Sequence, residues 1–87
     1  MELKKLYNLD IYKNIKVDEM LCKLHEEVNE VEFELVVPTT TESAIASEIL
    51  DVMQVCMGIA YTQNIDLSKY IDAHNYKLMS RGHKLID

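Results

Sequence analysis

Hydrophobic residues recur at intervals of three and four positions in the first half of this chain. The series follows a break at residues 14–17, and its members are Leu21, Leu24, Val28, Val31 and Leu35. Positions three and four apart lie on one face of an α-helix. The spacing therefore predicts a helix over residues 18–36 with a single apolar seam. Asp18 stands where an N-cap residue is expected.

A second series with the same spacing follows a loop at residues 37–41, which holds the only proline of the chain. Its members are Ile45, Ile49, Val52, Cys56 and Ile59. Thr39 and Glu42 have the spacing of a capping box, and Thr41 is the rival N-cap. Gly58 lies inside this predicted helix, where a glycine indicates the close approach of another element.

The pattern resumes after a break at residues 63–66 and predicts a third helix. Its apolar face carries Leu67, Ile71, His74 and Leu78. Asp66 or Ser68 could cap its beginning, and Gly82 is a natural C-terminal stop. His74 lies on this seam, so we expect its imidazole to be partly buried.

Residues 1–17 carry a weaker helical stripe, at Leu3, Leu6, Tyr7 and Ile11. Two glycines and one proline in 87 residues are too few for the many turns of an all-β domain. We therefore predict a single all-α domain over residues 1–87. It is a small bundle of three main helices, with room for a short N-terminal helix.

Composition and charge exclude some classes of protein and of function. Hydrophobic residues make up 48% and the formal net charge is −6, which argues against disorder and against nucleic-acid binding. No run approaches 18 apolar residues and the N-terminus lacks the apolar stretch of a signal peptide, so we expect a cytoplasmic protein with no membrane partner. Cys22 and Cys56 form no CxxC pair, and we expect two buried, reduced thiols.

Acidic residues lie beside the first two seams. Glu26, Glu27 and Glu30 form the motif EEVNE, and Glu48 and Asp51 form EILD. Glu27, Glu30, Glu48 and Asp51 each stand one position before a seam residue, so an antiparallel hairpin would bring the two acidic pairs face to face. Carboxylates this close repel one another unless protons or a cation neutralise them, and oxygen ligands suit Mg²⁺ or Mn²⁺. A solvated acidic face is the competing interpretation.

Other catalytic motifs fail on their letters. His25 and Glu26 begin like HExxH, but Asn29 stands in the fifth position. No histidine follows a glutamate at the spacing of a di-iron bundle, and the chain has neither a P-loop nor a nucleophile elbow.

The third predicted helix adds basic residues, in the pattern N-x-K-x-x-x-R. Lys77 and Arg81 are four positions apart and share a face, with Asn75 close by. Two cations and an amide suit phosphate oxygens. Basic residues are also expected at any helix C-terminus, because they complement the helix dipole.

In this order, the motifs resemble the MazG-like family of all-α nucleoside triphosphate pyrophosphohydrolases. That family is marked by EExxE, a spacer, ExxD and a downstream basic segment, which here covers roughly residues 20–83. The resemblance implies Mg²⁺-dependent cleavage of the α–β phosphoanhydride of an NTP or dNTP, giving a nucleoside monophosphate and pyrophosphate. It implies a role in house-cleaning or in control of nucleotide pools.

The resemblance also implies roles for individual residues. The metal would be held by Glu27, Glu30, Glu48 and Asp51. Glu26 and Glu30 are the candidates for the catalytic base. The substrate would be contacted by Asn75, Lys77 and Arg81. Two alternatives are a nucleotide-binding or helical interaction module without catalysis and, within the superfamily, a phosphoribosyl-ATP pyrophosphohydrolase.

Further apolar residues widen all three seams, among them Met20, Phe33, Met53, Tyr70 and Met79. One hairpin and a short third helix cover such surface poorly, and symmetric association is the usual remedy. MazG-like enzymes are typically dimers or pairs of dimers. We therefore predict a homodimer or homotetramer with its sites close to the interface.

Overall fold

The computed structural model describes residues 5–86, and the predicted all-α fold is confirmed for them. The elements in chain order are η1 (Asp10–Lys13), α1 (Val17–Val36), α2 (Glu42–Thr62), η2 (Leu67–Tyr70) and α3 (Ile71–Ser80). The two η elements are single 3₁₀ turns, and no strand occurs in this range. Three α-helices were predicted and three are present, but the pattern of the third begins at Leu67, which lies in η2, and α3 itself begins at Ile71.

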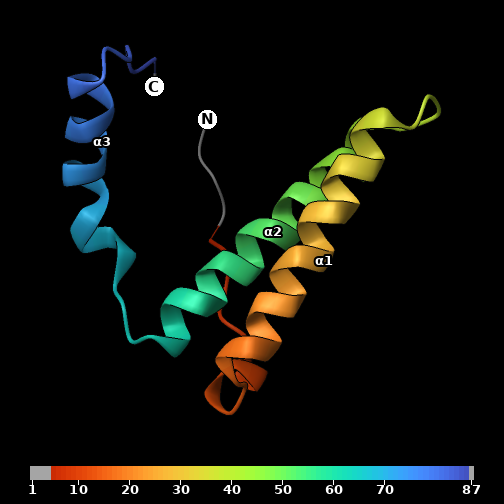
Figure 1. Ribbon diagram of the computed structural model, residues 1–87, viewed down its shortest axis with the longest axis horizontal. Helices are drawn as coiled ribbons and strands as arrows, with labels where there is room; N and C mark the ends of the chain where they lie inside the picture. The colour runs from red at the N-terminus through yellow and green to blue at the C-terminus, as the bar shows by residue number, and fades with distance from the viewer. Residues whose placement is uncertain (1–4, 87) are drawn as a thin grey trace.

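Helices α1 and α2 form an antiparallel hairpin (Figure 1). Helix α1 begins at Val17, so Asp18 lies in its first turn rather than at its cap. At the start of α2, the Thr41 hydroxyl accepts a hydrogen bond from the backbone N–H of Ala44 at 3.2 Å. Thr41 is therefore the N-cap, and the alternative capping box of Thr39 and Glu42 is wrong.

A small core forms near the open end of the hairpin. Tyr12, Met20 and Val55 are buried there, each with at most 6% of its surface exposed. A Cβ added at Gly58 would lie 2.6 Å from Cζ of Tyr12 and 2.7 Å from Cε of Met20. Position 58 is a glycine because Tyr12 and Met20 fill the place where a side chain would start. The predicted close approach at Gly58 is confirmed.

The N-terminal segment crosses the hairpin in a mostly extended form (Figure 1). The predicted N-terminal helix is reduced to the single turn η1, and Leu3 lies outside the described residues. Two contacts hold this segment against α2. The Tyr12 hydroxyl donates to the carbonyl of Gln54 at 3.2 Å, and the Gln54 side-chain amide donates to the carbonyl of Tyr7 at 2.6 Å.

A hydrogen-bonded connector leads from α2 to α3. Asn64 has a left-handed backbone with φ 58°, and the N–H of Ile65 donates to the carbonyl of Ala60 at 2.9 Å. Asp66 then caps η2, its carboxylate accepting from the N–H of Ser68 at 3.1 Å. Each step of the turn is thus fixed by local hydrogen bonds.

Helix α3 stands apart from the hairpin (Figure 1), and none of its residues is buried. It ends before Gly82, which has φ 88° and is the predicted stop. His74 is exposed, so the expectation of a partly buried imidazole is wrong. The seam of α3 is apolar as predicted, but within one chain it has no hairpin face to cover it.

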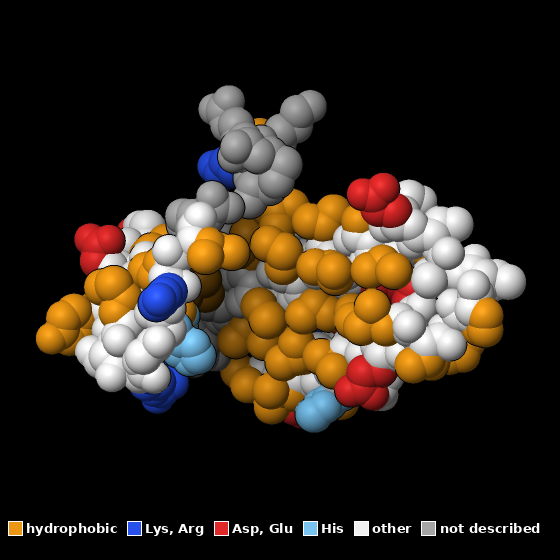
Figure 2. All heavy atoms as spheres, turned by 90° about the horizontal axis from the view of Figure 1, so that it is seen from above, with side chains coloured by type: hydrophobic (Ala, Val, Ile, Leu, Met, Phe, Trp, Pro, Cys, Tyr) orange, Lys and Arg blue, Asp and Glu red, His pale blue; other side chains and the backbone are white. Residues whose placement is uncertain are grey.

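Much apolar surface is exposed. Figure 2 shows hydrophobic side chains gathered over the hairpin. Both cysteines are free, but Cys22 and Cys56 are exposed rather than buried as expected. Of the described residues, only helix α2 is long and apolar enough to cross a membrane, with a mean hydropathy of 1.4 over its most apolar window. Its middle carries Glu48 and Asp51, so length and composition alone are weak evidence for a span.

Candidate metal centre

The two acidic pairs meet across the hairpin. Glu27 and Glu30 lie one turn apart on α1, and Glu48 and Asp51 lie one turn apart on α2. One carboxylate oxygen from each of the four residues falls within 4.8 Å of the others. The predicted face-to-face arrangement of these two pairs is therefore present in the fold.

Burial makes this cluster different from a solvated acidic face. Glu27 is only 5% exposed, and Glu48 is half-buried. Oε2 of Glu27 and Oε2 of Glu48 are both shielded from solvent and have no hydrogen-bond partner. A buried carboxylate oxygen without a partner is costly, because it has lost its water and gained nothing in exchange. A bound cation would satisfy both of these oxygens.

The donor set also fits a particular kind of cation. All four groups are carboxylates, with no histidine or cysteine among them. Hard oxygen ligands favour Mg²⁺ and Mn²⁺ over zinc or copper. Glu30 and Asp51 are exposed, so one side of the cluster is open to a substrate or to water.

A lysine that sequence analysis did not single out neutralises part of the cluster. Nζ of Lys23 lies 3.0 Å from Oε1 of Glu27, one turn away on α1. Hydrogen bonding to Glu27 raises the pKa of Lys23 above its ordinary value of 10.5. The i, i+4 spacing of Lys23 and Glu27 was the available sequence signal. Lys23 satisfies Oε1 alone and leaves Oε2 of Glu27 to another partner.

The crowded carboxylates raise the pKa of Glu30. Hydrogen bonding to Glu48 raises the pKa of the Glu30 carboxyl from 4.5 to about 7, and the negative charge of Glu27 adds to the effect. Without a metal, the cluster therefore holds a proton at Glu30 near neutral pH. A cation that binds there must displace this proton.

Glu26 lies outside the four-residue cluster. It is exposed, and its carboxylate is 4.0 Å from Nζ of Lys23. Glu26 and Glu30 are four positions apart and share a side of α1. Glu26 is thus close to the cluster without being one of its members.

A hollow of about 600 Å³ adjoins the cluster, between the N-terminal segment and the hairpin. Glu27 and Asp51 lie at its acidic end, and Gln54 and Tyr12 also line it. Its apolar wall includes Leu9, Ile11 and Ile15. The size is that of a small-molecule site. Sequence analysis missed Tyr12 and Gln54, because nothing in their local pattern marks a contact between residues 42 positions apart.

The predicted substrate residues are not brought to the cluster within one chain. Asn75, Lys77 and Arg81 belong to α3 and its end, which stand apart from the hairpin (Figure 1). Asn75 is half-buried, and Lys77 and Arg81 are exposed. Arg81 is the C-cap residue of α3, one position beyond its end, and in a single chain the arm stands apart from the carboxylates.

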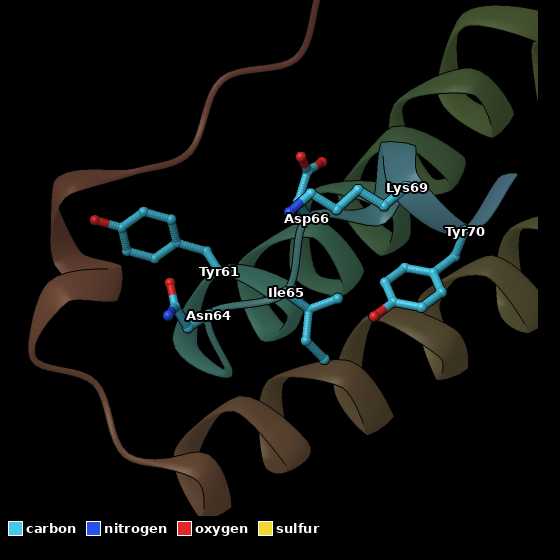
Figure 3. A pocket seen from close by; sticks show the side chains of 6 residues that line it. All are labelled: Tyr61, Asn64, Ile65, Asp66, Lys69 and Tyr70. Atoms are coloured by element: carbon cyan, nitrogen blue, oxygen red, sulfur yellow. The ribbon is translucent and has the colours of Figure 1, made fainter.

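A second hollow, of about 610 Å³, lies at the connector. Figure 3 shows Tyr61 and Tyr70 on either side of Ile65, with Asp66 and Lys69 nearby. None of the four clustered carboxylates lines this hollow. Tyr61 and Tyr70 therefore belong to the junction between α2 and α3 rather than to the candidate metal centre.

None of the family models, curated proteins or solved structures compared with this chain matches it. The interpretation of the site therefore depends on its own geometry and chemistry.

Proposed function

We propose that this protein is a MazG-like nucleotide pyrophosphohydrolase, which cleaves an NTP or dNTP between the α and β phosphates in the presence of Mg²⁺. One observation carries the proposal: four carboxylates from two helices converge, with one oxygen of each within 4.8 Å of the others. The order of the motifs EEVNE, EILD and N-x-K-x-x-x-R supports the same function.

The four carboxylates of the cluster are the proposed metal ligands. Glu27 and Glu48 each offer a buried oxygen without a partner, and Glu30 and Asp51 complete the set from the exposed side. Bound Mg²⁺ supplies charge neutralisation for phosphate oxygens and lowers the pKa of a bound water. Lys23 holds the second oxygen of Glu27 and so fixes the orientation of this carboxylate.

The hollow beside the cluster is the proposed place for the nucleoside. Glu27 and Asp51 line the hollow and would help to hold the metal that neutralises the phosphates, while Leu9, Ile11 and Tyr12 would offer apolar surface to the base. The side-chain amide of Gln54 keeps the N-terminal segment in place through the carbonyl of Tyr7. The N-terminal segment thus forms a wall of the substrate site.

Glu26 and Glu30 are the two candidates for the group that takes the proton from the attacking water. A base works best when its pKa lies near the working pH, and the pKa of Glu30 is raised to about 7. Glu26 has the advantage that it is not needed as a metal ligand. A substitution at Glu26 can separate the two roles, because loss of a base alone spares metal binding, whereas Glu30 is also a proposed ligand.

The experiment that tests the function is an assay of pyrophosphate release. The purified protein is mixed with Mg²⁺ and a panel of NTPs, dNTPs and phosphoribosyl-ATP, and nucleotide products are identified by chromatography. The expected products are a monophosphate and pyrophosphate in equal amounts. Release of orthophosphate would place the cleavage at another bond. Binding of a nucleotide without any product would favour the binding module, and neither binding nor product would favour the interaction module.

A pair of variants tests the base. Glu26→Gln and Glu30→Gln are compared for turnover and for the rise in melting temperature that Mg²⁺ produces. If Glu26 is the base, Glu26→Gln should lose about 10²- to 10⁴-fold in turnover and keep the thermal shift. Glu30→Gln removes a proposed ligand and should lose both turnover and the thermal shift. If Glu26→Gln also loses the thermal shift, Glu26 takes part in metal binding. Its placement outside the ligand set is then wrong.

A further inference from the structure

The N-terminal segment is attached to the hairpin at two points of different kinds. At the first, the ring of Tyr12 is buried in the small core, with 6% of its surface exposed. At the second, Nε2 of Gln54 donates to the carbonyl of Tyr7 at 2.6 Å. Among the described residues, this is the only hydrogen bond that joins residues 5–9 to the hairpin. The stretch from Tyr7 to Tyr12, which we call the strap, is thus fixed by packing at one end and by a side-chain amide at the other.

Side-chain packing does not hold the strap between these two points. Leu9 and Ile11 are 48% and 63% exposed, although both are large and apolar. They line the hollow beside the carboxylate cluster rather than fill it. Before Tyr7, another hollow of about 550 Å³ lies between residues 5–8 and the end of α2 with its connector. Because hollows lie on both sides of the hydrogen bond, the position of the strap backbone depends on Gln54.

The donors of the Gln54 amide determine this attachment. A carbonyl oxygen can only accept a hydrogen bond, so the amide nitrogen of Gln54, and not its oxygen, must face Tyr7. Nε2 also lies 3.4 Å from the Tyr12 hydroxyl, which in turn donates to the backbone carbonyl of Gln54 at 3.2 Å. Both N–H groups of the amide thus have partners in the strap. A side chain of the same length without a donor cannot make these contacts.

The same amide lies close to the carboxylate cluster. Gln54 follows Asp51 by three positions in α2, so the two residues share a face and are about 4.5 Å apart along the helix axis. Both line the hollow between the strap and the hairpin, as does Glu27. A ligand held through a metal at the cluster would therefore reach the strap within one helical turn.

We infer that Gln54 is a positioning residue, whose side-chain amide keeps the strap closed over the hollow so that the strap holds the part of the ligand that extends beyond the phosphates. The role in ligand binding rests on the proposed function, for which this part is the nucleoside. The closure of the strap does not rest on it. Gln54 should therefore matter for the binding of a nucleotide and not for the binding of inorganic triphosphate, which has no nucleoside.

The first test measures how often the strap opens in the protein without a ligand. Chymotrypsin must enclose the backbone on both sides of the bond that it cleaves, so cleavage after Tyr7 requires the strap to lift from α2, and its rate follows the open population. Gln54→Met keeps the length of the side chain and removes both donors. It should make cleavage after Tyr7 about two- to tenfold faster, the effect of losing one hydrogen bond. Tyr76 is as exposed as Tyr7, at 70%, and cleavage after it should not change.

Three further variants separate the donors from the other properties of the side chain. Gln54→Glu has nearly the same shape but no donor when it is ionised, so it should open the strap as Gln54→Met does. Gln54→Lys restores donors for the Tyr7 carbonyl, so cleavage should stay close to the wild-type rate. Gln63→Met makes the same change at the exposed C-cap of α2 and should leave cleavage after Tyr7 unchanged. Circular dichroism checks that each variant keeps its helix content.

The second test compares two kinds of probe in the presence of Mg²⁺. The first probes are the α,β-methylene analogues of ATP, GTP, CTP and UTP, which the proposed reaction cannot cleave, and the second is inorganic triphosphate. Calorimetry measures the affinity of each for the wild type and for Gln54→Met. The variant should bind the nucleotide analogue at least twofold more weakly, and at most by the factor measured for opening, because its closed fraction is smaller. Its affinity for inorganic triphosphate should equal that of the wild type.

Each other outcome overturns the inference. Unchanged cleavage after Tyr7 in Gln54→Met means that packing alone holds the strap. Faster cleavage with an unchanged affinity for the nucleotide means that the strap takes no part in binding. Equal weakening of both probes means that Gln54 acts on the metal cluster instead. If neither probe binds the wild type, the proposed function fails and the role in ligand binding fails with it, whereas cleavage after Tyr7 still decides whether Gln54 holds the strap.

Discussion

Lys23 pairs with Oε1 of Glu27 at 3.0 Å, while Oε2 of the same carboxylate is shielded from water and has no partner. Half of the carboxylate is thus satisfied by the protein itself. The other half has no hydrogen-bond partner, and Glu27 shares its cluster with three further carboxylates. This asymmetry distinguishes the cluster from ordinary surface acids and leads to four predictions.

The first prediction concerns metal binding at Glu48. Mg²⁺ or Mn²⁺ should raise the unfolding midpoint of the wild type. At a metal concentration 100 times Kd, the free energy of unfolding should increase by about 2.7 kcal/mol. Glu48→Gln should abolish most of this gain and most turnover, because it removes a ligand whose buried oxygen has no other partner. Differential scanning fluorimetry with and without metal measures the gain.

Glu42→Gln is the matched control for that variant. Glu42 lies exposed in the first turn of the same helix, so its loss removes the same charge without touching the cluster. An undiminished metal shift in Glu48→Gln would rule out the four-carboxylate site.

The second prediction concerns pH without metal. The pKa of Glu30 is about 7 in the folded protein against 4.5 in the unfolded chain, so between these values the folded state binds more protons. The free energy of unfolding should therefore fall as the pH rises through this window. The stabilisation from the protonated carboxyl is complete below about pH 4.5 and is lost above about pH 7.

Urea unfolding in the presence of a chelator, at several pH values, checks this dependence. Glu30→Gln should flatten it, because a neutral amide replaces the titrating group. The difference between the two curves isolates Glu30 from the other carboxylates. Parallel curves for the wild type and Glu30→Gln would contradict the raised pKa.

The third prediction concerns the basic face of α3. Lys77→Ala and Arg81→Ala should each raise KM for the nucleotide about ten- to a hundredfold, the effect of losing a charged hydrogen bond of ~1.5–3 kcal/mol. Lys84→Ala removes the same charge just beyond the helix and should have little effect. Steady-state kinetics measure KM, and circular dichroism checks helix content. Equal KM values for all three variants would reduce Lys77 and Arg81 to helix-terminal charges.

The fourth prediction concerns Gly58. Its Cβ position lies 2.6 Å from Tyr12, so Gly58→Ala must push the N-terminal segment off α2. Overpacking of this kind costs about 1–3 kcal/mol, which thermal or urea unfolding measures. Ser47→Ala, at an exposed position of the same helix, should change stability by less than about 0.5 kcal/mol. A stabilised Gly58→Ala protein would mean that Tyr12 does not pack in this place.

The carboxylate cluster was predictable because local rules determine it. Glu27 and Glu48 each stand one position before a seam residue, and a loop of five residues forces two packed helices to run antiparallel. Those two facts bring the acidic pairs together. The start of α1 at Val17 lies one residue before the predicted start, and Thr41, one of two predicted N-caps, caps α2. The third helix begins later than its apolar pattern, at Ile71.

The parts that could not be predicted depend on contacts between distant residues. Periodicity shows that Cys56 and His74 lie on apolar seams, but it does not show what covers a seam, and both side chains are exposed. Tyr12 and Gln54 meet across 42 positions without any local signal. The direction of a connector decides whether the same chain covers a seam. Composition and spacing do not encode this direction.

The connector between α2 and α3 also has a consequence for how the chain folds. Its hydrogen bonds join residues no more than five positions apart, such as Ile65 with Ala60. Such turns form quickly, since little loop entropy is lost, and helical hairpins with local contacts fold fast. The direction of α3 is therefore set early in folding, before contacts form between residues that are far apart in the sequence, such as Tyr12 and Gln54.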